Sequence, residues 1–230
     1  MNAVLEFSSV SLAERAPYEN GLRAVSFTLE PGDLLLVQLP EGYPLSPLAD
    51  VASGLVEPDE GVIRFLGKSW AEGYEADRAS ARGRIGRVFE RAGWLSNLDI
   101  DENITLAQRY HTRRDPAEIL AEAQTLAREL GLGEIPAGRP AHQDRAVLLA
   151  AQWVRALVAH PRLLLLERPV RDLPDADVES FVRAILRRRE QDGLAVVWLT
   201  DSHERVADSA LRPTRKCAMQ DGELQDWISR

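Results

Sequence analysis

Three short and unbroken runs of apolar residues are the feature that most constrains the fold of this chain. They cover residues 34–37, 163–166 and 195–199. A strand that is covered on both faces is apolar throughout, and such strands are typical of parallel sheets. Segments with helical spacing separate these runs, so strands alternate with helices along the chain. The sequence therefore predicts an α/β fold around a mainly parallel sheet with crossover connections.

Further strands and helices are expected on either side of these runs. The predicted strands are residues 4–8, 25–29, 61–66 and 85–89, and residues 48–54 are predicted to form a short helix. Asp115 and Pro116 place an N-cap and an N1 proline at the start of a longer helix that ends near Gly131. Two more helices are expected, at about 145–160 and across 178–186, with a hairpin turn at 220–222. The helical segment from about 101 to 139 is interpreted as an insertion between strands.

Composition and charge exclude several classes of function. Of the 230 residues, 45% are hydrophobic and 28% are charged, as in an ordinary globular protein. The formal net charge of −8 argues against broad electrostatic binding to nucleic acid or anionic lipid. Cys217 is the only cysteine, so an intramolecular disulfide is excluded. We recognise no signal peptide and no stretch that approaches 18 apolar residues, so work at a membrane would depend on a partner.

Several small motifs occur in an order and spacing that point to one family. They are Gly32, Ser53-Gly54-Leu55, Pro58, Gly61, Val88-Phe89, Asn103, Arg155-Ala156-Leu157, Pro161, Pro169 and Asp221-Gly222. Together with the run at 163–166, they resemble the ATP-binding domain of ABC transporters across residues 4–227. The resemblance implies a single domain over residues 1–230 with a P-loop NTPase-like ABC ATPase fold. Its core, about 1–90 and 160–230, would hold a mainly parallel sheet and an N-terminal antiparallel β subdomain, and a helical subdomain would span about 91–159.

The phosphate loop of this family, GxxxxGKST, is only partly retained. In the family, backbone N–H groups form an anion nest and the lysine reaches the β- and γ-phosphates. Here the lysine position is Leu45, and Pro44 and Pro47 each lack an N–H group. Gly42 and Ser46 survive, and Ser46 stands where the family ligates Mg²⁺. The alternatives are weak nucleotide binding by these remnants and an ordinary strand-to-helix loop.

Other residues near this loop, and the histidines, also bear on ligand binding. Glu41 adds negative charge where phosphates would lie. Tyr18 is either the aromatic residue that stacks on adenine or a packed surface tyrosine. No metal-binding spacing is found among His111, His142, His160 and His203. We therefore expect no metal centre and no tightly bound cofactor, with ATP and Mg²⁺ bound weakly at most.

The positions that activate water and sense the γ-phosphate are also replaced. By the resemblance, Glu167 takes the place of the metal-binding aspartate and Arg168 that of the glutamate general base. An arginine cannot accept a proton near neutral pH, so this position holds no base. Arg168 either points at the former phosphate site and replaces the missing charge, or is an ordinary surface or salt-bridged arginine. Glu90 replaces the Q-loop glutamine, and Asp201 replaces the switch histidine.

The signature motif at the start of the helix at 145–160 has lost its glycines. The family's LSGGQ corresponds here to a segment that contains Gln143, Asp144 and Arg145. Glycines in that motif let a helix N-terminus approach the γ-phosphate across a dimer. The joint losses indicate a fold that is kept for contacts instead of catalysis, and we assign no catalytic residue.

The resemblance also implies partners and a location. We expect an ABC permease subunit and a homologous ATP-binding subunit, in a homodimer or heterodimer, with the membrane reached only through the partner. The chain would lie on the cytoplasmic face of the inner membrane as a structural or regulatory subunit without ATP hydrolysis. The alternatives are a stand-alone regulatory or scaffold protein on this fold, and a residual ATP-binding protein with weak ATPase activity.

The segment after the Q-loop carries the predicted partner contact. Trp94, Leu95, Leu98 and Ile100 form an apolar group that we expect to be partly exposed. These residues either meet the permease or cap the helical subdomain. The stretch at 103–111 resembles the ATP-binding subunits of MCE-type (Mla) lipid transport systems, which implies a lipid cargo.

Overall fold

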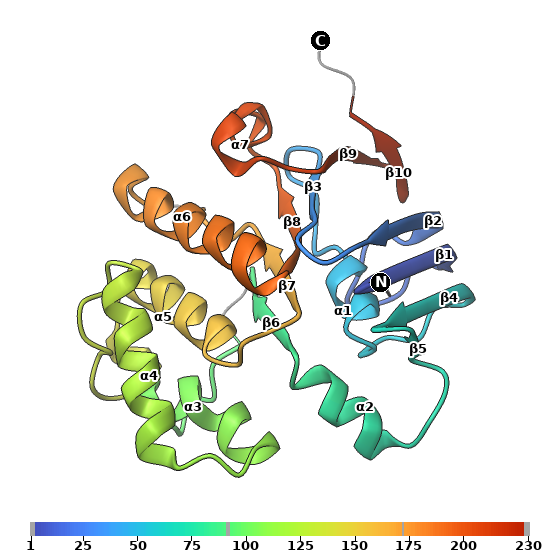
Figure 1. Ribbon diagram of the computed structural model, residues 1–230. Helices are drawn as coiled ribbons and strands as arrows, with labels where there is room; N and C mark the ends of the chain where they lie inside the picture. The colour runs from blue at the N-terminus through green and yellow to red at the C-terminus, as the bar shows by residue number, and fades with distance from the viewer. Residues whose placement is uncertain (1–2, 91–92, 172, 228–230) are drawn as a thin grey trace.

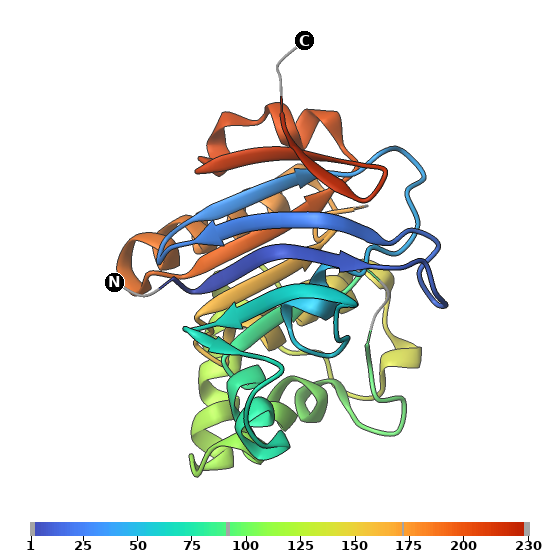
Figure 2. The same cartoon turned by 90° about the vertical axis from the view of Figure 1, so that its right-hand side faces the viewer.

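An antiparallel sheet near the N-terminus is the first of two sheets in this fold (Figures 1 and 2). The computed structural model describes residues 3–90, 93–171 and 173–227. The sheet has the order β2-β1-β4-β5, with antiparallel pairing throughout. Its strands are β1 (Leu5–Leu12), β2 (Leu22–Leu29), β4 (Glu60–Phe65) and β5 (Lys68–Ser69). Phe7 stacks on Phe27 across β1 and β2, with ring centres 4.5 Å apart.

The second sheet is the mainly parallel core that the apolar runs predict. Its strands are β3 (Leu34–Gln38), β6 (Ile85–Val88), β7 (Leu163–Glu167), β8 (Ala195–Thr200), β9 (Arg215–Gln220) and β10 (Glu223–Asp226). The order is β10-β9-β3-β8-β7-β6, and only β10 pairs antiparallel among these strands. Every residue of β7 and β8 is buried, which explains why these strands do not alternate in polarity.

Helices cover the parallel sheet on one side, and the antiparallel sheet covers it on the other (Figure 1). The longer helices are α2 (Glu75–Arg82), α3 (Ile100–His111), α4 (Pro116–Glu129), α5 (Arg145–Leu157) and α6 (Asp175–Asp192). Short helical turns are α1 (Leu48–Ala52), α7 (His203–Ala207), η1 (Pro140–His142) and η2 (Ser209–Leu211). Leu34 and Leu36 of β3 pack in the cluster that contains α5 and α6, whereas Leu35 and Val37 pack with the antiparallel sheet.

The predicted helical insertion between β6 and β7 is present as α3, α4, η1 and α5. Asp99 and Glu102 form a capping box that begins α3. Asp115 begins α4 by accepting a hydrogen bond from the backbone N–H of Ala117 at 2.7 Å, with Pro116 in the first helical turn, as predicted. Sequence-local capping therefore sets where both helices start.

Two predicted helices are shorter than expected. The helix predicted at 48–54 ends at Ala52, because Gly54 adopts the left-handed backbone conformation with φ of +65°. The helix predicted to reach residue 160 ends at Leu157. The strand predicted at 85–89 ends at Val88, which leaves Phe89 and Glu90 in the loop that follows β6.

Close backbone packing joins α5 to the edge strand β6. A Cβ atom at Gly86 would lie 2.2 Å from the carbonyl oxygen of Ala156, so only glycine allows this approach. On the core side of α5, Trp153 stacks on Phe181 of α6 at 4.6 Å between ring centres. Trp153 also meets Trp198 of β8 edge-on, and both tryptophans are fully buried. These contacts fix α5 against β6, α6 and β8.

Candidate functional site

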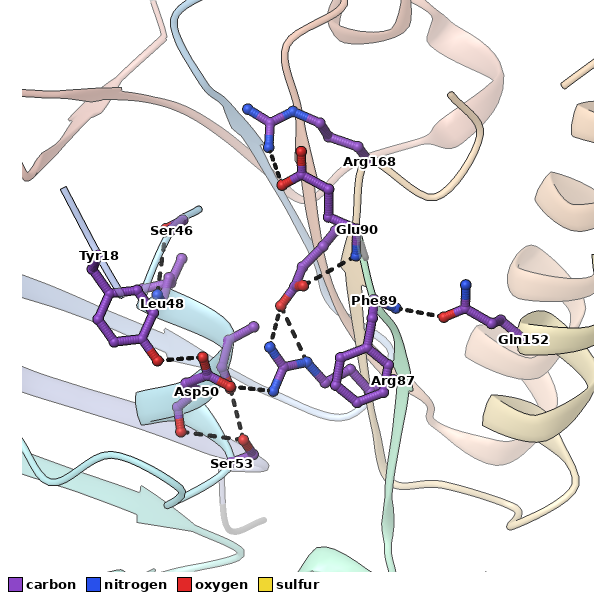
Figure 3. Close-up of polar contacts among 12 residues, drawn as sticks. Tyr18, Ser46, Leu48, Asp50, Ser53, Arg87, Phe89, Glu90, Gln152 and Arg168 are labelled. Carbon is purple, nitrogen blue, oxygen red and sulfur yellow. Dashed lines mark hydrogen bonds and ion pairs between the residues drawn. The ribbon is translucent and has the colours of Figure 1, made fainter. Parts of the chain in front are cut away.

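The sequence-predicted site residues converge where the parallel strands end, at the same edge of the sheet. β3 leads into the loop at 39–47, β6 leads to Glu90, β7 ends at Glu167 beside Arg168, and β8 is followed by Asp201. Figure 3 shows Glu90 and Arg168 side by side, with Ser46 and Tyr18 on the far side of a second group of charges. Four separate segments of the chain therefore supply one site.

The loop at 39–47 keeps the position of a phosphate loop but not its donors. Ser46 is buried, and its Oγ accepts a hydrogen bond from the backbone N–H of Leu48 at 3.3 Å. Leu45, in the place of the family's lysine, packs against the apolar cluster of the antiparallel sheet. Gly42 has φ of +70°, which glycine adopts without strain. The surviving serine hydroxyl therefore accepts from the backbone N–H of the first residue of α1.

Arg168 is the centre of one ionic network at this site. Its Nη1 donates to Glu90 Oε2 at 2.5 Å, and its Nε donates to Asp201 Oδ2 at 2.9 Å. Its Nη2 donates to the carbonyl oxygen of Tyr43, inside the phosphate loop, at 2.6 Å. The side chain is only 3% exposed, so a surface arginine is excluded. Arg168 is thus salt-bridged, and it also points into the phosphate loop. The sequence treats these two arrangements as alternatives, and the structure has both.

Arg171 adds a second cation to the same two carboxylates. Its Nη2 lies 2.5 Å from Asp201 Oδ2, and its Nη1 lies 3.5 Å from Glu90 Oε1. Unlike Arg168, the Arg171 side chain is 43% exposed. The two arginines therefore pair with the same carboxylates but differ strongly in solvent exposure. Mutagenesis can compare them within one protein.

Arg87 is the centre of a second ionic network, which sequence reasoning missed (Figure 3). Its Nη1 donates to Asp50 Oδ1 at 2.5 Å, and its Nε donates to Glu167 Oε1 at 3.1 Å. Tyr18 donates its hydroxyl hydrogen to the other oxygen of Asp50. Burial lowers the pKa of Arg87. The negative charges and hydrogen bonds of Glu167 and Asp50 raise it by more than burial lowers it, so the pKa of Arg87 lies above its ordinary value. Asp50 and Arg87 lie outside the family's reactive motifs, so no motif singled them out.

The two networks leave no surplus of positive charge at the strand ends. The carboxylates of Asp50, Glu90, Glu167 and Asp201 face the guanidinium groups of Arg87, Arg168 and Arg171. A triphosphate would have to displace these carboxylates, because a buried cation that is already paired offers no free charge. Arg87, Arg168 and Arg171 therefore offer a triphosphate no cation that is without a carboxylate partner.

Two residues are more buried than the sequence predicts. Tyr18 is 7% exposed and packs in the cluster of the antiparallel sheet, so it is packed but does not lie on the surface, and its stacking on adenine stays a prediction. Burial, and then the bond to Asp50, raise the pKa of Tyr18. Ile100 is fully buried in the first turn of α3, so it cannot belong to an exposed apolar group.

The remaining predicted residues belong to the segment after β6 and to the start of α5. Trp94 and Leu98 are half-buried, and Leu95 is 48% exposed. Asp144 is the N-cap of α5, next to Gln143, whose Nε2 donates to the carbonyl oxygen of Ala137. Gln143, Arg145, Glu90 and Arg168 all line a hollow of about 190 Å³. The signature position and the Q-loop position of the same chain therefore share one hollow.

The buried carboxyl of Glu167 should make the free energy of unfolding depend on pH. Burial raises the pKa of Glu167, although Arg87 and the backbone N–H of Glu90 oppose this shift. A carboxyl whose folded pKa is raised contributes stability below its unfolded pKa, and this contribution is lost as pH rises through the folded pKa. We expect the unfolding free energy of the wild type, relative to Glu167→Gln, to increase as pH falls from 8 to 5 in urea denaturation. A difference that shrinks on acidification would show that Arg87 keeps Glu167 ionised.

Comparison with known proteins places this chain in a family. The family model of the ABC transporter matches residues 22–171. The chain is 28% identical over 193 residues to the macrolide export ATP-binding/permease protein MacB of Azoarcus sp. (strain BH72), covering 83% of this chain and 29% of that protein. It is 31% identical over 194 residues to the sulfate/thiosulfate import ATP-binding protein CysA of Synechococcus elongatus, covering 82% and 53%. The chain thus spans well under two thirds of the length of these relatives.

Solved structures support the same fold. The dimeric structure of MJ0796, a bacterial ABC transporter cassette, matches with a TM-score of 0.84 at 19% identity, covering 98% of this chain and 100% of that chain. The structure of an ATP-binding subunit of an ABC transporter matches with a TM-score of 0.81 at 20% identity, covering 96% and 88%. No helix in the described ranges has the length and apolar character needed to cross a membrane. This chain belongs to the family of ABC transporter ATP-binding domains.

Proposed function

We propose that this chain is a subunit of a membrane transport complex that does not hydrolyse ATP and serves as a structural or regulatory partner. The observation that carries the proposal is the position of Arg168. This arginine stands where the family has its general base, and it bonds Glu90, Asp201 and the Tyr43 carbonyl. In this role the chain would bind a permease and a homologous ATP-binding subunit on the cytoplasmic face of a membrane.

The ionic network argues against hydrolysis in two ways. Arg168 cannot remove a proton from water near neutral pH, because its guanidinium stays protonated. Glu90 and Asp201 also carry negative charge toward the place where a γ-phosphate would lie, and they hold the cation that would have to bind it. Entry of a phosphate would break buried ion pairs without replacing the lost N–H donors of Pro44 and Pro47.

Nucleotide titration provides the direct test. A ligand that binds only the folded state stabilises it by about 2.7 kcal/mol at one hundred times its dissociation constant. We expect the melting temperature to stay unchanged with millimolar ATP and Mg²⁺ in a thermal-shift assay. The variant Leu45→Lys should respond no more than the wild type, because Pro44 and Pro47 still remove two donors. An ATP-dependent rise that Ser46→Ala abolishes would instead support the residual ATP-binding alternative.

Affinity purification from native membranes, followed by mass spectrometry, tests the place in a complex. Recovery of a permease with the chain is the expected result, and it identifies the partner. Its absence, together with a free chain in the unbound fraction, would favour the stand-alone scaffold alternative. The lipid cargo implied by residues 103–111 stays a prediction, and the recovered permease decides it. The relatives carry names of macrolide exporters and sulfate importers, so cargo differs among relatives at this level of identity.

A further inference from the structure

A hollow of about 260 Å³ between the β4–β5 hairpin and α2 is separate from the strand-end site. None of the described residues that line it belongs to the Arg87 or the Arg168 network. β5 and α2 run in opposite directions, and the loop at 70–74 joins them (Figure 1). Pockets for drug-sized ligands measure about 300–1,000 Å³, so this hollow has the size for a smaller molecule.

The apolar wall of the hollow is held firmly in place. Leu66, Trp70 and Ala81 are half-buried, and they line the hollow together with the buried Phe65. The rings of Phe65 and Trp70 stack with their centres 5.7 Å apart. The indole Nε1 of Trp70 donates to the carbonyl oxygen of Ala52 in α1 at 3.1 Å. Trp70 is therefore fixed by stacking and by a hydrogen bond, and part of its surface remains available to a ligand.

Two cations without a counter-charge lie at one end of the hollow, where β5 begins and α2 ends. Lys68 begins β5 and pairs across the hairpin with Phe65, so the two side chains lie on one face. Arg84 follows the last residue of α2. Both cations are exposed, and neither forms an ion pair with a described residue. Arg78 also lines the hollow, but its Nε donates to Glu75 Oε2 at 3.0 Å, so its charge is already paired.

Two carboxylates lie at the other end of the hollow. Glu72 is in the loop that joins β5 to α2, and Asp77 is in the first turn of α2. At the helical rise of 1.5 Å per residue, Asp77 and Arg84 are about 10 Å apart along the axis of α2. Both carboxylates are exposed, and neither pairs with a described cation. Opposite charges thus line one hollow at its two ends without neutralising each other.

Ser69 adds a buried hydroxyl to the same hollow. Its side chain follows Lys68 in β5, and the residue is only 8% exposed. The Oγ accepts a hydrogen bond from the backbone N–H of Ala71 at 3.2 Å. Its own hydrogen has no acceptor among the described residues. Buried donors normally have an acceptor, so this hydroxyl can donate to a bound ligand.

We propose that this hollow binds a small zwitterion with an apolar side chain, namely a free amino acid or a dipeptide. The ligand carboxylate meets Lys68 and Arg84 at one end. The ligand ammonium group meets Glu72 and Asp77 at the other end, and the apolar side chain packs on Trp70. A few placed polar groups on an apolar wall are the usual means by which a pocket orients a small ligand. The inference is independent of the proposed function, because the hollow shares no described residue with the phosphate-loop site.

Isothermal titration calorimetry of the purified full chain with leucyl-leucine and with leucine tests the proposal. We expect at least one of the two to bind with a Kd between about 10 µM and 1 mM, the range that a ligand of this size reaches. The N-acetylated form of that ligand lacks the ammonium group, and its amide lacks the carboxylate. Each of these two analogues should bind about tenfold more weakly, because each leaves one end of the hollow unmatched.

Four variants assign the two ends of the ligand to the two ends of the hollow. Asp77→Asn should weaken the zwitterion about tenfold and leave the N-acetylated analogue unchanged. Lys68→Gln should weaken the zwitterion similarly and leave the amide unchanged. Ala81→Trp fills the hollow and should abolish binding, and Ala81→Leu replaces it if that variant fails to fold. Arg183→Gln removes an exposed charge on α6 and should bind like the wild type.

Three results would overturn the zwitterion site. The first is the absence of saturable heat with both leucine and leucyl-leucine up to about 10 mM. The second is equal affinity for the N-acetylated analogue or the amide, because one charged end of the hollow would then play no part. The third is binding that survives filling of the hollow at Ala81, which would place the ligand elsewhere. These measurements need neither a permease nor a nucleotide, so they leave the proposed function untouched.

Discussion

Arg168→Glu is expected to lower the free energy of unfolding by about 3–5 kcal/mol, the range found when a buried ion pair loses one partner. The substitution would place a third carboxylate beside Glu90 and Asp201, and it would leave the Tyr43 carbonyl without its donor. In a chain of this size, such a loss lowers the melting temperature by about 10 °C. Urea denaturation and calorimetry of the purified chain measure both quantities.

Arg171→Ala is the matched control for this prediction. Arg171 pairs with the same two carboxylates, but it is 43% exposed, where Arg168 is 3% exposed. An exposed ion pair contributes about 1 kcal/mol or less, so this variant should remain close to the wild type. Unchanged or higher stability in Arg168→Glu would contradict the assignment of Arg168 as the cation that holds the former phosphate site together.

The second large effect is expected at Trp153, which connects α5 to the site. Trp153→Ala should cost about 3–5 kcal/mol, because it leaves a cavity between Phe181 and Trp198 in the fully buried core. The indole Nε1 also donates to the carbonyl oxygen of Pro169, the residue after Arg168, at 3.0 Å. The loss should therefore also loosen the turn that carries Arg168, which hydrogen exchange of the backbone amides after β7 can detect.

Trp153→Phe separates packing from hydrogen bonding in this prediction. Phenylalanine keeps an aromatic ring on Phe181 and removes the donor to Pro169, so we expect a cost of about 1–3 kcal/mol. Equal costs for the alanine and phenylalanine variants would show that the hydrogen bond, and not the aromatic stack, holds α5 to this turn. A cost below 1 kcal/mol for both would contradict the assignment of Trp153 to the core.

The sequence predicted the parallel sheet because burial on both faces leaves a visible pattern. The strands β7 and β8 are buried at every residue, so each appears as an uninterrupted apolar run. The start of α4 was predictable for a related reason, since Asp115 caps the backbone only two residues away. In both cases the physical cause lies within a few residues of the position that it determines.

The ion pairs of the site were not predictable in the same way. Asp50 and Arg87 are 37 residues apart, and Arg87 and Glu167 are 80 apart, so no local pattern relates their charges. The position of Arg168 in the family's motif suggested where it points, but not that Tyr43 supplies its acceptor. Ile100 was predicted to be partly exposed because it follows Trp94, Leu95 and Leu98 in the same apolar stretch, whereas it lies in the first turn of α3 and is fully buried. Tertiary packing decided these positions.

The ion pairs around Arg87 and Arg168 also affect how the chain depends on its surroundings in the cell. A domain that binds a ligand is more fully folded when that ligand is abundant, so its stability follows the ligand's concentration. Here the charges that join the phosphate loop, β6, β7 and the segment after β8 belong to the chain itself. With no stabilisation by ATP, the result expected of the thermal-shift assay, the folded fraction is independent of the energy state of the cell. During starvation, this subunit would persist at its partner while nucleotide-dependent homologues lose the stabilisation that ATP provides.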